Sequence, residues 1–144
     1  MTPDPIPLWT HIHGATSHFP IALMFVSFAF DYGALLFRKP VWRTVAFWAL
    51  VTAAILAVPT LLSGLTGQLG WFHVTAVDAS DHLLPHRNAA LISSGIIVPL
   101  CLWRVLRKDR LAGREFALYL VILTIATVAI GYTGWLGAYV GKGY

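Results

Sequence analysis

Six histidines are the residues of this chain best suited to metal chemistry, and all of them lie on the same side of its apolar segments: His11, His13, His18, His73, His82 and His86. His18 and His86 stand out because Pro20 and Pro85 mark helix starts beside them. A helix N-terminus disfavours a charged imidazole, and the neutral imidazole is the form that binds metals. We therefore take His18 and His86 as candidate metal ligands. The alternative is an interfacial histidine that bonds a helix start or a lipid headgroup.

Two glycine-rich stretches are the second feature, with the shared pattern G-x-T-G-x-L-G at residues 64–70 and 131–137. Small residues at this spacing let another surface approach the helix backbone. That surface is either a neighbouring helix or a flat ligand. Two histidines facing across glycine-lined walls would form a slot for a haem b with two axial histidines. The expected lining is Gly64, Gly67, Gly131 and Gly134, and the expected hydrogen-bonding neighbours are Thr16, Ser17, Thr66 and Thr133.

Other metal sites have weaker support. Copper favours thiolate or thioether ligands, of which the chain has only Met1, Met24 and Cys101. A zinc or iron site would draw on the loop residues His11, His13, His73, Asp78, Asp81 and His82. Solvated loop histidines are the simpler interpretation of that set.

Asp31 is the one acidic residue inside an apolar segment. A buried carboxylate needs a partner, and Arg43 or Arg104 would supply one. The alternatives are proton handling or an inner quinone site.

Composition identifies the setting of these residues. Of the 144 residues, 58% are hydrophobic and 11% are charged, where soluble domains have about a quarter charged. Mean hydropathy is +0.72. These values exclude a soluble enzyme, a disordered protein and a disulfide scaffold, and indicate an integral membrane protein. The basic residues flank apolar runs, which is not the arrangement of a nucleic-acid-binding surface.

Four apolar runs are long enough to span a bilayer, which takes about 20 residues. They cover about Phe19–Phe37, Thr44–Leu69, Ala89–Leu106 and Phe116–Val140. Eight of the ten Lys and Arg lie on one side, and only Arg87 and Lys142 lie on the other. The positive-inside rule makes the basic side cytoplasmic. Both termini and the histidines then face the periplasm across a bacterial inner membrane.

The chain also has the pattern of a duplicated hairpin. Besides the glycine motifs, H-x-x-x-A-L occurs at residues 18–23 and again at residues 86–91, so both motifs recur at almost the same interval. We predict a single all-α domain over residues 1–144, with one repeat over about 11–72 and a second over about 79–140. Both copies start outside, so the repeats are parallel and form a four-helix bundle with a pseudo-twofold axis. If the first and third helices are diagonal neighbours, His18 and His86 face each other.

The motif His18-Phe-Pro-Ile-Ala-Leu, the following Asp31 and the glycine-rich end of the second span resemble a family of bacterial predicted membrane proteins, domain of unknown function 2231. The resemblance covers about His11 to Gly141. It implies a four-span inner-membrane domain. Some members are fused to, or encoded near, redox modules such as Rieske or cytochrome c domains. The family pattern points at His18 and then at His86.

These features together predict an electron carrier with one b-type haem near the periplasmic face, linking the quinone pool to a periplasmic redox protein. Trp71, Phe72, Trp135 and Tyr139 would line an outer quinone pocket. The alternatives are a non-catalytic anchor or assembly subunit of a larger complex, and a haem-free quinone-binding or transport subunit. A homodimer is equally compatible with the apolar spans. No catalytic triad, phosphate loop or HExxH motif marks a stand-alone enzyme.

Overall fold

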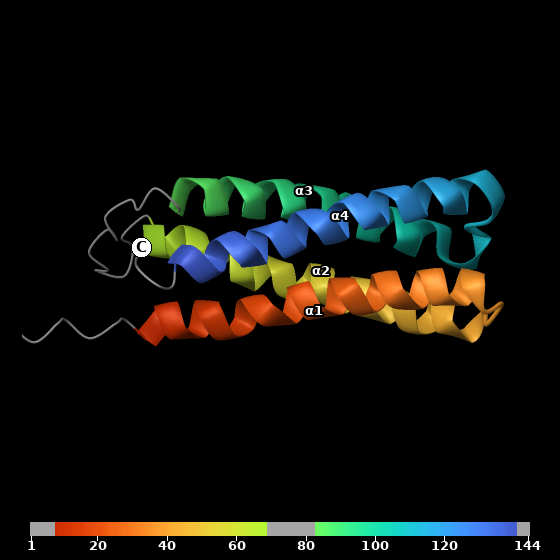
Figure 1. The fold of residues 1–144 in the computed structure, drawn as a ribbon, viewed down its shortest axis with the longest axis horizontal. Helices are drawn as coiled ribbons and strands as arrows, with labels where there is room; N and C mark the ends of the chain where they lie inside the picture. Colours follow the sequence, from red (N-terminus) through yellow and green to blue (C-terminus); the bar gives the residue numbers. More distant parts are fainter. Residues whose placement is uncertain (1–7, 69–82, 141–144) are drawn as a thin grey trace, which may run out of the picture.

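The computed structural model describes residues 8–68 and 83–140, and Figure 1 shows their four long helices side by side in one bundle. Each helix is long and apolar enough to cross a membrane. In lipid the backbone must satisfy its own polar groups, which a helix does within one segment. The elements are α1 (Leu8–Leu36), α2 (Val41–Gln68), α3 (Leu83–Arg107), the short 3₁₀ helix η1 (Lys108–Arg110) and α4 (Gly113–Val140).

The four predicted spans are confirmed, although each helix extends beyond the predicted limits on at least one side. The largest difference is in α1, which begins at Leu8, so Pro20 lies inside this helix and does not mark its start. His18 is therefore in the third turn of a continuous helix, away from the helix N-terminus. Pro85 does lie in the first turn of α3, as expected.

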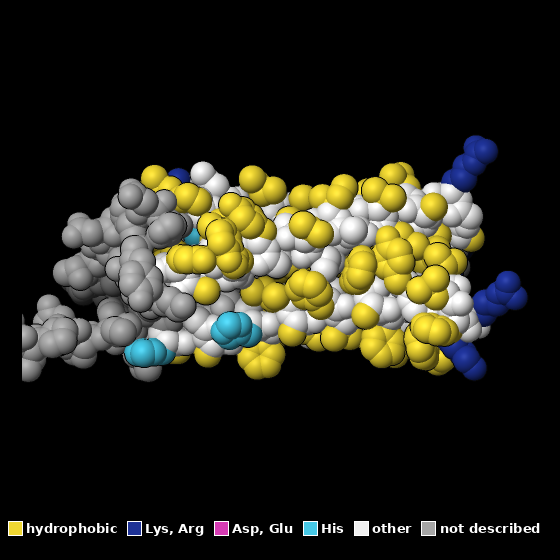
Figure 2. Space-filling view, in the orientation of Figure 1, with side chains coloured by type: hydrophobic (Ala, Val, Ile, Leu, Met, Phe, Trp, Pro, Cys, Tyr) yellow, Lys and Arg dark blue, Asp and Glu magenta, His cyan; other side chains and the backbone are white. Residues whose placement is uncertain are grey.

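The helices follow one another around the bundle. α1 packs against α2 and α4, and α3 packs against the same two helices, so α1 and α3 face each other across a diagonal. Both hairpins turn at the same end of the bundle, where Lys and Arg side chains project (Figure 2). We call this the basic end, defined by Arg38 and Arg110. The opposite end, where His13 and His86 lie, is the histidine end.

Burial in the first hairpin recurs in the second at a constant interval. Met24 and Ile97 are both fully buried, and so are Leu50 and Leu123. Each residue of the second hairpin follows its counterpart by the same step in residue number. We call the step from Met24 to Ile97 the hairpin offset.

The glycine and histidine motifs recur after slightly fewer residues than the hairpin offset. A pattern with glycine at every third position matches itself again when it is shifted by two of these three-residue intervals, so the glycine motif fits both spacings. At the hairpin offset, Gly64 corresponds to Gly137, and the counterpart of His86 is His13.

Candidate functional site

His86 is held by α4 near the start of α3. Its Nδ1 atom lies 3.0 Å from the carbonyl oxygen of Thr133. A carbonyl only accepts hydrogen bonds, so Nδ1 carries the hydrogen, and in the neutral imidazole the lone pair is then on Nε2. A Cβ on Gly137 would lie 3.1 Å from Cε1 of this imidazole, so the ring fits into a notch that the glycine leaves open.

His13 is held in the same way by the other hairpin. Its Nδ1 atom lies 2.8 Å from the Ser63 hydroxyl, and the ring also bonds the backbone of Thr60. A Cβ on Gly64 would lie 3.0 Å from Cε1 of the ring. Thr60 and Gly64 are the counterparts of Thr133 and Gly137 at the hairpin offset. The two imidazoles therefore occupy equivalent places on diagonal helices.

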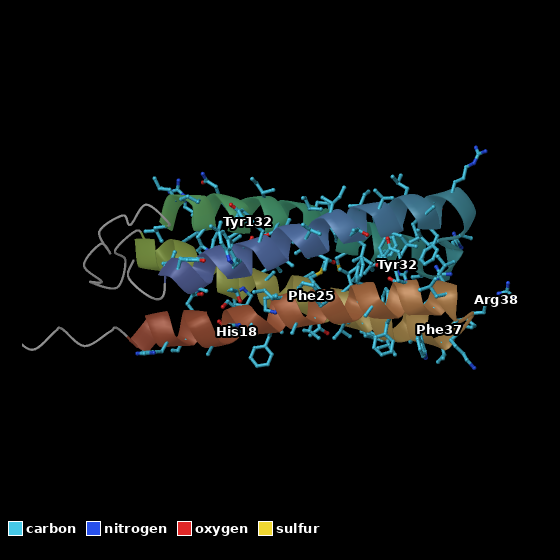
Figure 3. The ribbon with its side chains drawn as sticks, viewed as in Figure 1. His18, Phe25, Tyr32, Phe37, Arg38 and Tyr132 are labelled. Atoms are coloured by element: carbon cyan, nitrogen blue, oxygen red, sulfur yellow. The ribbon has the colours of Figure 1, made fainter. Side chains whose placement is uncertain are left out.

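The expected pairing of His18 with His86 is not found. His18 is exposed, and Figure 2 shows histidine side chains on the outer surface of α1 (His18 is labelled in Figure 3). His18 comes five positions after His13, which rotates the side chain by about 140° around the helix. The residue that faces the bundle interior is His13, which the sequence reasoning assigned to a solvated loop.

The glycines of α4 are packing residues and do not line a slot. A Cβ on Gly134 would lie 2.9 Å from Cδ1 of Ile21, and one on Gly131 would lie 3.3 Å from Cζ of Phe25. Side chains of α1 fill the space expected for a macrocycle at both positions. Gly64 is covered by His13 instead. The surroundings of Gly67 and Thr66 lie outside the described residues.

The expected hydrogen-bonding neighbours divide into two groups. Thr133 contacts His86, as predicted, although through its backbone carbonyl and not its hydroxyl. Thr16 donates its hydroxyl to carbonyls of its own helix, at Ile12 and His13, and Ser17 donates to Gly14. Ser63, the partner of His13, was not predicted, because no sequence motif singles it out.

Small residues follow the two histidines along the core faces of α1 and α3. Ser17 and Ala90 come one turn later, and both are half-buried. Two further turns bring Met24 and Ile97, which fill the centre of the bundle. On this diagonal a small side chain therefore lies between each histidine and the centre of the bundle, and the imidazole rings cover the glycines that face them on α2 and α4.

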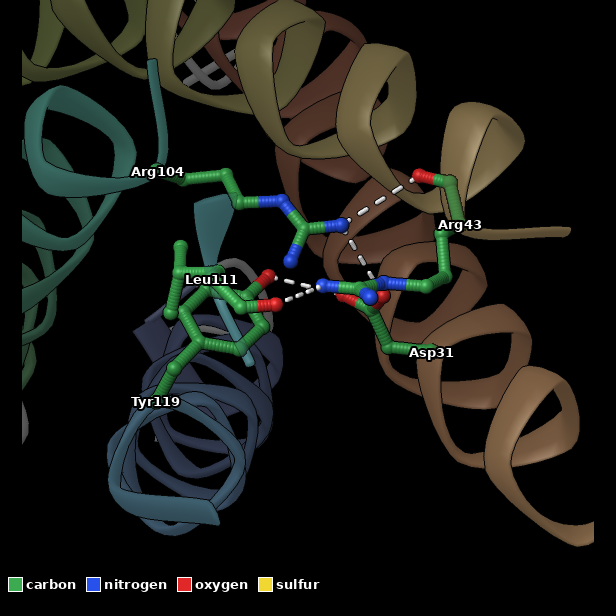
Figure 4. A network of polar contacts seen from close by, with 5 residues as sticks. All are labelled: Asp31, Arg43, Arg104, Leu111 and Tyr119. Atoms are coloured by element: carbon green, nitrogen blue, oxygen red, sulfur yellow. Dashed lines mark hydrogen bonds and ion pairs between the residues drawn. The ribbon is translucent and has the colours of Figure 1, made fainter. Parts of the chain in front are cut away.

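The basic end of the same diagonal carries a buried ion pair. Nη2 of Arg104 lies 3.1 Å from Oδ1 of Asp31, and the Tyr119 hydroxyl donates to Oδ2 at 2.8 Å (Figure 4). Asp31 and Tyr119 are fully buried, and Arg104 is 2% exposed. Arg104 is one of the two partners predicted for Asp31. Tyr119 engages the second carboxylate oxygen and was not predicted.

Arg43, the other predicted partner, supports this pair indirectly. Its carbonyl oxygen accepts a hydrogen bond from Nη2 of Arg104 at 3.3 Å, and its Nη2 donates to the carbonyl of Leu111 at 2.7 Å. The guanidinium carbon lies 4.1 Å from the centre of the Phe116 ring. Arg43 thus ties the start of α2 to the turn before α4.

Six of the predicted residues lie outside the described part of the chain: His73, His82, Asp78, Asp81, Trp71 and Phe72. Within residues 8–68 and 83–140, no three metal-ligating side chains gather. Trp135 stacks on Tyr132 and meets Tyr139 edge to face on α4, and all three are exposed where lipid would contact the helix. That position is typical of an aromatic belt.

Comparison with known proteins gives one family. No curated protein and no solved structure matches the chain. The family model described as "Predicted membrane protein (DUF2231)" matches residues 10–144, which include nearly all of the four helices and both ends of the diagonal. The chain therefore belongs to this family of membrane proteins.

Proposed function

We propose that this chain binds one haem b at the histidine end, where His13 and His86 would hold the iron, and carries electrons between the quinone pool and a periplasmic redox protein. The observation that carries the proposal is the equivalent placement of two imidazoles on diagonal helices, each engaged at Nδ1. Histidines that bind a metal usually use their second ring nitrogen in this way, which fixes the ring orientation. Nε2 is then the ligating atom.

The side chains around the two histidines suit a large flat ligand. Ser17 and Ala90, one turn beyond the two histidines, are small and half-buried, so a macrocycle held between the imidazoles would displace little side-chain volume there. Haem b also brings two carboxylates. Arg87, next to His86, is the basic residue at this end of the described part of the chain, and its buried Nε has no hydrogen-bond partner there. A propionate is a suitable partner for it.

The chain's own residues have a limited task in this proposal. Haem b, when bound, supplies a one-electron iron couple. Ser63 and the Thr133 carbonyl hold the imidazoles, and Met24, Ile97 and the residues beyond them separate this end from the basic end. Under the positive-inside rule the basic end is cytoplasmic, so the haem would lie near the periplasmic face of an inner membrane.

The absorption spectrum of the purified protein tests this proposal. The protein is produced with ample haem precursor, purified in detergent, and measured air-oxidised and dithionite-reduced. We expect a Soret band and a sharp reduced α band with one haem per chain. His13→Ala and His86→Ala lose the six-coordinate spectrum. His18→Ala is the matched control, because this exposed histidine lies on the same helix, and it keeps the spectrum.

Two results would overturn the proposal. Folded protein that carries no visible absorption would favour the anchor or assembly subunit. A spectrum lost in His18→Ala and kept in His13→Ala would place the ligand on the outer face of α1. If haem binds, reduction by a short-chain quinol, followed by stopped-flow absorbance, tests the electron-transfer part separately.

A further inference from the structure

A groove opens at the basic end between the turn of the first hairpin and the start of α4. Its volume is about 440 Å³. Apolar walls come from Leu35, Pro40 and Phe116, and two arginines, Arg38 and Arg43, lie along it. The helices α1, α2 and α4 all end or begin here, which is the level at which apolar spans meet lipid headgroups.

The two arginines present their charges differently. Arg43 is fixed, because its guanidinium lies over the Phe116 ring and donates to the Leu111 carbonyl. Arg38 is exposed and extends beyond the hairpin turn (Figure 3). A fixed cation inside an apolar groove and a second, movable cation at its mouth suit a ligand with an anionic head and an apolar body.

The charge around the groove is positive, like that of the two arginines. Eight of the ten Lys and Arg of the chain lie at the basic end of the bundle. Among the described residues that line the groove none is acidic, and the nearby Glu115 is paired with Arg107 at 2.7 Å. Exposed apolar side chains adjoin the groove in the sequence: Leu36, the last residue of α1, and Phe37, which follows it.

We infer that this groove binds an anionic phospholipid, with the phosphate between Arg38 and Arg43 and the glycerol backbone against Pro40 and Phe116. The observation that carries the inference is the two arginines on a groove whose other walls are apolar and which lies at headgroup level. This site is remote from the histidine end, about five helical turns along the bundle. It is independent of haem binding.

Lipid binding to the detergent-purified full chain is counted by native mass spectrometry during titration with phosphatidylglycerol and, in parallel, phosphatidylcholine. The first phosphatidylglycerol is expected to bind about tenfold more tightly than phosphatidylcholine, and Arg38→Gln to weaken it about fivefold. Arg110→Gln removes the same charge from the same end, outside the groove, and is expected to change binding less than about twofold. Ala112→Phe keeps every charge and fills the groove, so it weakens binding at least as much as Arg38→Gln.

Several outcomes would overturn the inference. Equal binding of the two lipids, equal losses for Arg38→Gln and Arg110→Gln, or unchanged binding in Ala112→Phe would each show a general surface charge effect. Displacement of the lipid by millimolar inorganic phosphate would assign the site to a free anion. Dimers that form in place of the lipid-bound monomer would assign the groove to a second copy of the chain.

Discussion

Asp31 and Arg104 face each other on the α1–α3 diagonal at the basic end. His13 and His86 occupy the same diagonal at the histidine end. In each helix the two positions are separated by five full turns, so they share one face and lie about 27 Å apart. The pair at the basic end has opposite charges, and with the help of Tyr119 both carboxylate oxygens of Asp31 are engaged. Two identical imidazoles have no such complementarity, and each is held by its own hairpin instead.

This difference separates a structural pair from a candidate binding pair. Asp31 is fully buried, and Arg104 and Tyr119 engage both of its carboxylate oxygens. His13 and His86 are half-buried, and their hydrogen bonds orient the rings without joining them to each other. We therefore expect stability to depend on the basic end and ligand binding on the histidine end.

The largest expected effect is the loss of one member of the ion pair. Arg104→Met leaves the Asp31 carboxylate buried without its counter-ion, which costs about 3–5 kcal/mol. The double variant Asp31→Leu/Arg104→Met is expected to regain most of this loss, because no charge stays uncompensated. The free energy of unfolding is measured by titrating sodium dodecyl sulfate into detergent micelles, with helix content followed by circular dichroism.

His86→Ala is the corresponding change at the other end. It removes one hydrogen bond of a half-buried side chain, so we expect a loss below about 1.5 kcal/mol. A loss as large as that of Arg104→Met would contradict the division of roles between the two ends.

A charge exchange tests the equivalence of the two positions on the diagonal. Asp31→Arg/Arg104→Asp restores an ion pair in mirror order and is expected to be more stable than either single reversal, which places like charges together. At the hairpin offset, Ala46 is the counterpart of Tyr119. The carboxylate moved to position 104 therefore has a buried alanine where Asp31 has a hydroxyl donor. We expect a free energy of unfolding about 2 kcal/mol below the wild type in the same titration. An exchanged variant no better than the single reversals would argue against the hairpin offset.

Loss of the Tyr119 hydroxyl is expected to cost less than loss of Arg104. Tyr119→Phe keeps the buried ring and removes the donor to Oδ2 of Asp31, and a hydrogen bond to a charged group contributes about 1.5–3 kcal/mol. Tyr32→Phe is the matched control. Its hydroxyl meets the neutral Thr124 hydroxyl at 2.8 Å, so its loss should cost about 0.5–1.5 kcal/mol. Equal losses in the unfolding titration would mean that the carboxylate carries no charge in the folded protein.

Hydropathy and charge were sufficient to predict the helices, because each apolar run is long and the basic residues lie at the turns. They were also sufficient to place Asp31 beside an arginine. Pro20 and the motif shared by residues 18–23 and 86–91 both favoured His18, whereas the structure places His18 on the exposed surface of α1 and His13 on its core side. The rotation of α1 about its axis decides which histidine faces the core, and that rotation is set by packing.

A signal for His13 was present in the sequence. The spacing from His13 to Asp31 equals the spacing from His86 to Arg104, and it is a whole number of helical turns, so each histidine shares the core face of its charged residue. This signal can be recognised only once Asp31 and Arg104 are known to pair. That pair fixes the number of residues by which the second hairpin follows the first. Tyr119 had no such signal, because an aromatic residue in a span is ordinarily a packing residue.

The smallest expected effect concerns the glycine notch behind His86. Alanine is a better helix former than glycine by up to about 1 kcal/mol, so Gly95→Ala, which meets nothing within 4 Å, should raise the free energy of unfolding. Gly137→Ala gains the same propensity, but its Cβ would lie 3.1 Å from the His86 ring and must displace it by a few tenths of an ångström. We expect unchanged stability within about 0.5 kcal/mol and a shift of the His86 ring resonances in the NMR spectrum. A Gly137→Ala variant as stable as Gly95→Ala, with unshifted resonances, would show that the notch does not position the imidazole, and the case for His86 as an oriented ligand would weaken accordingly.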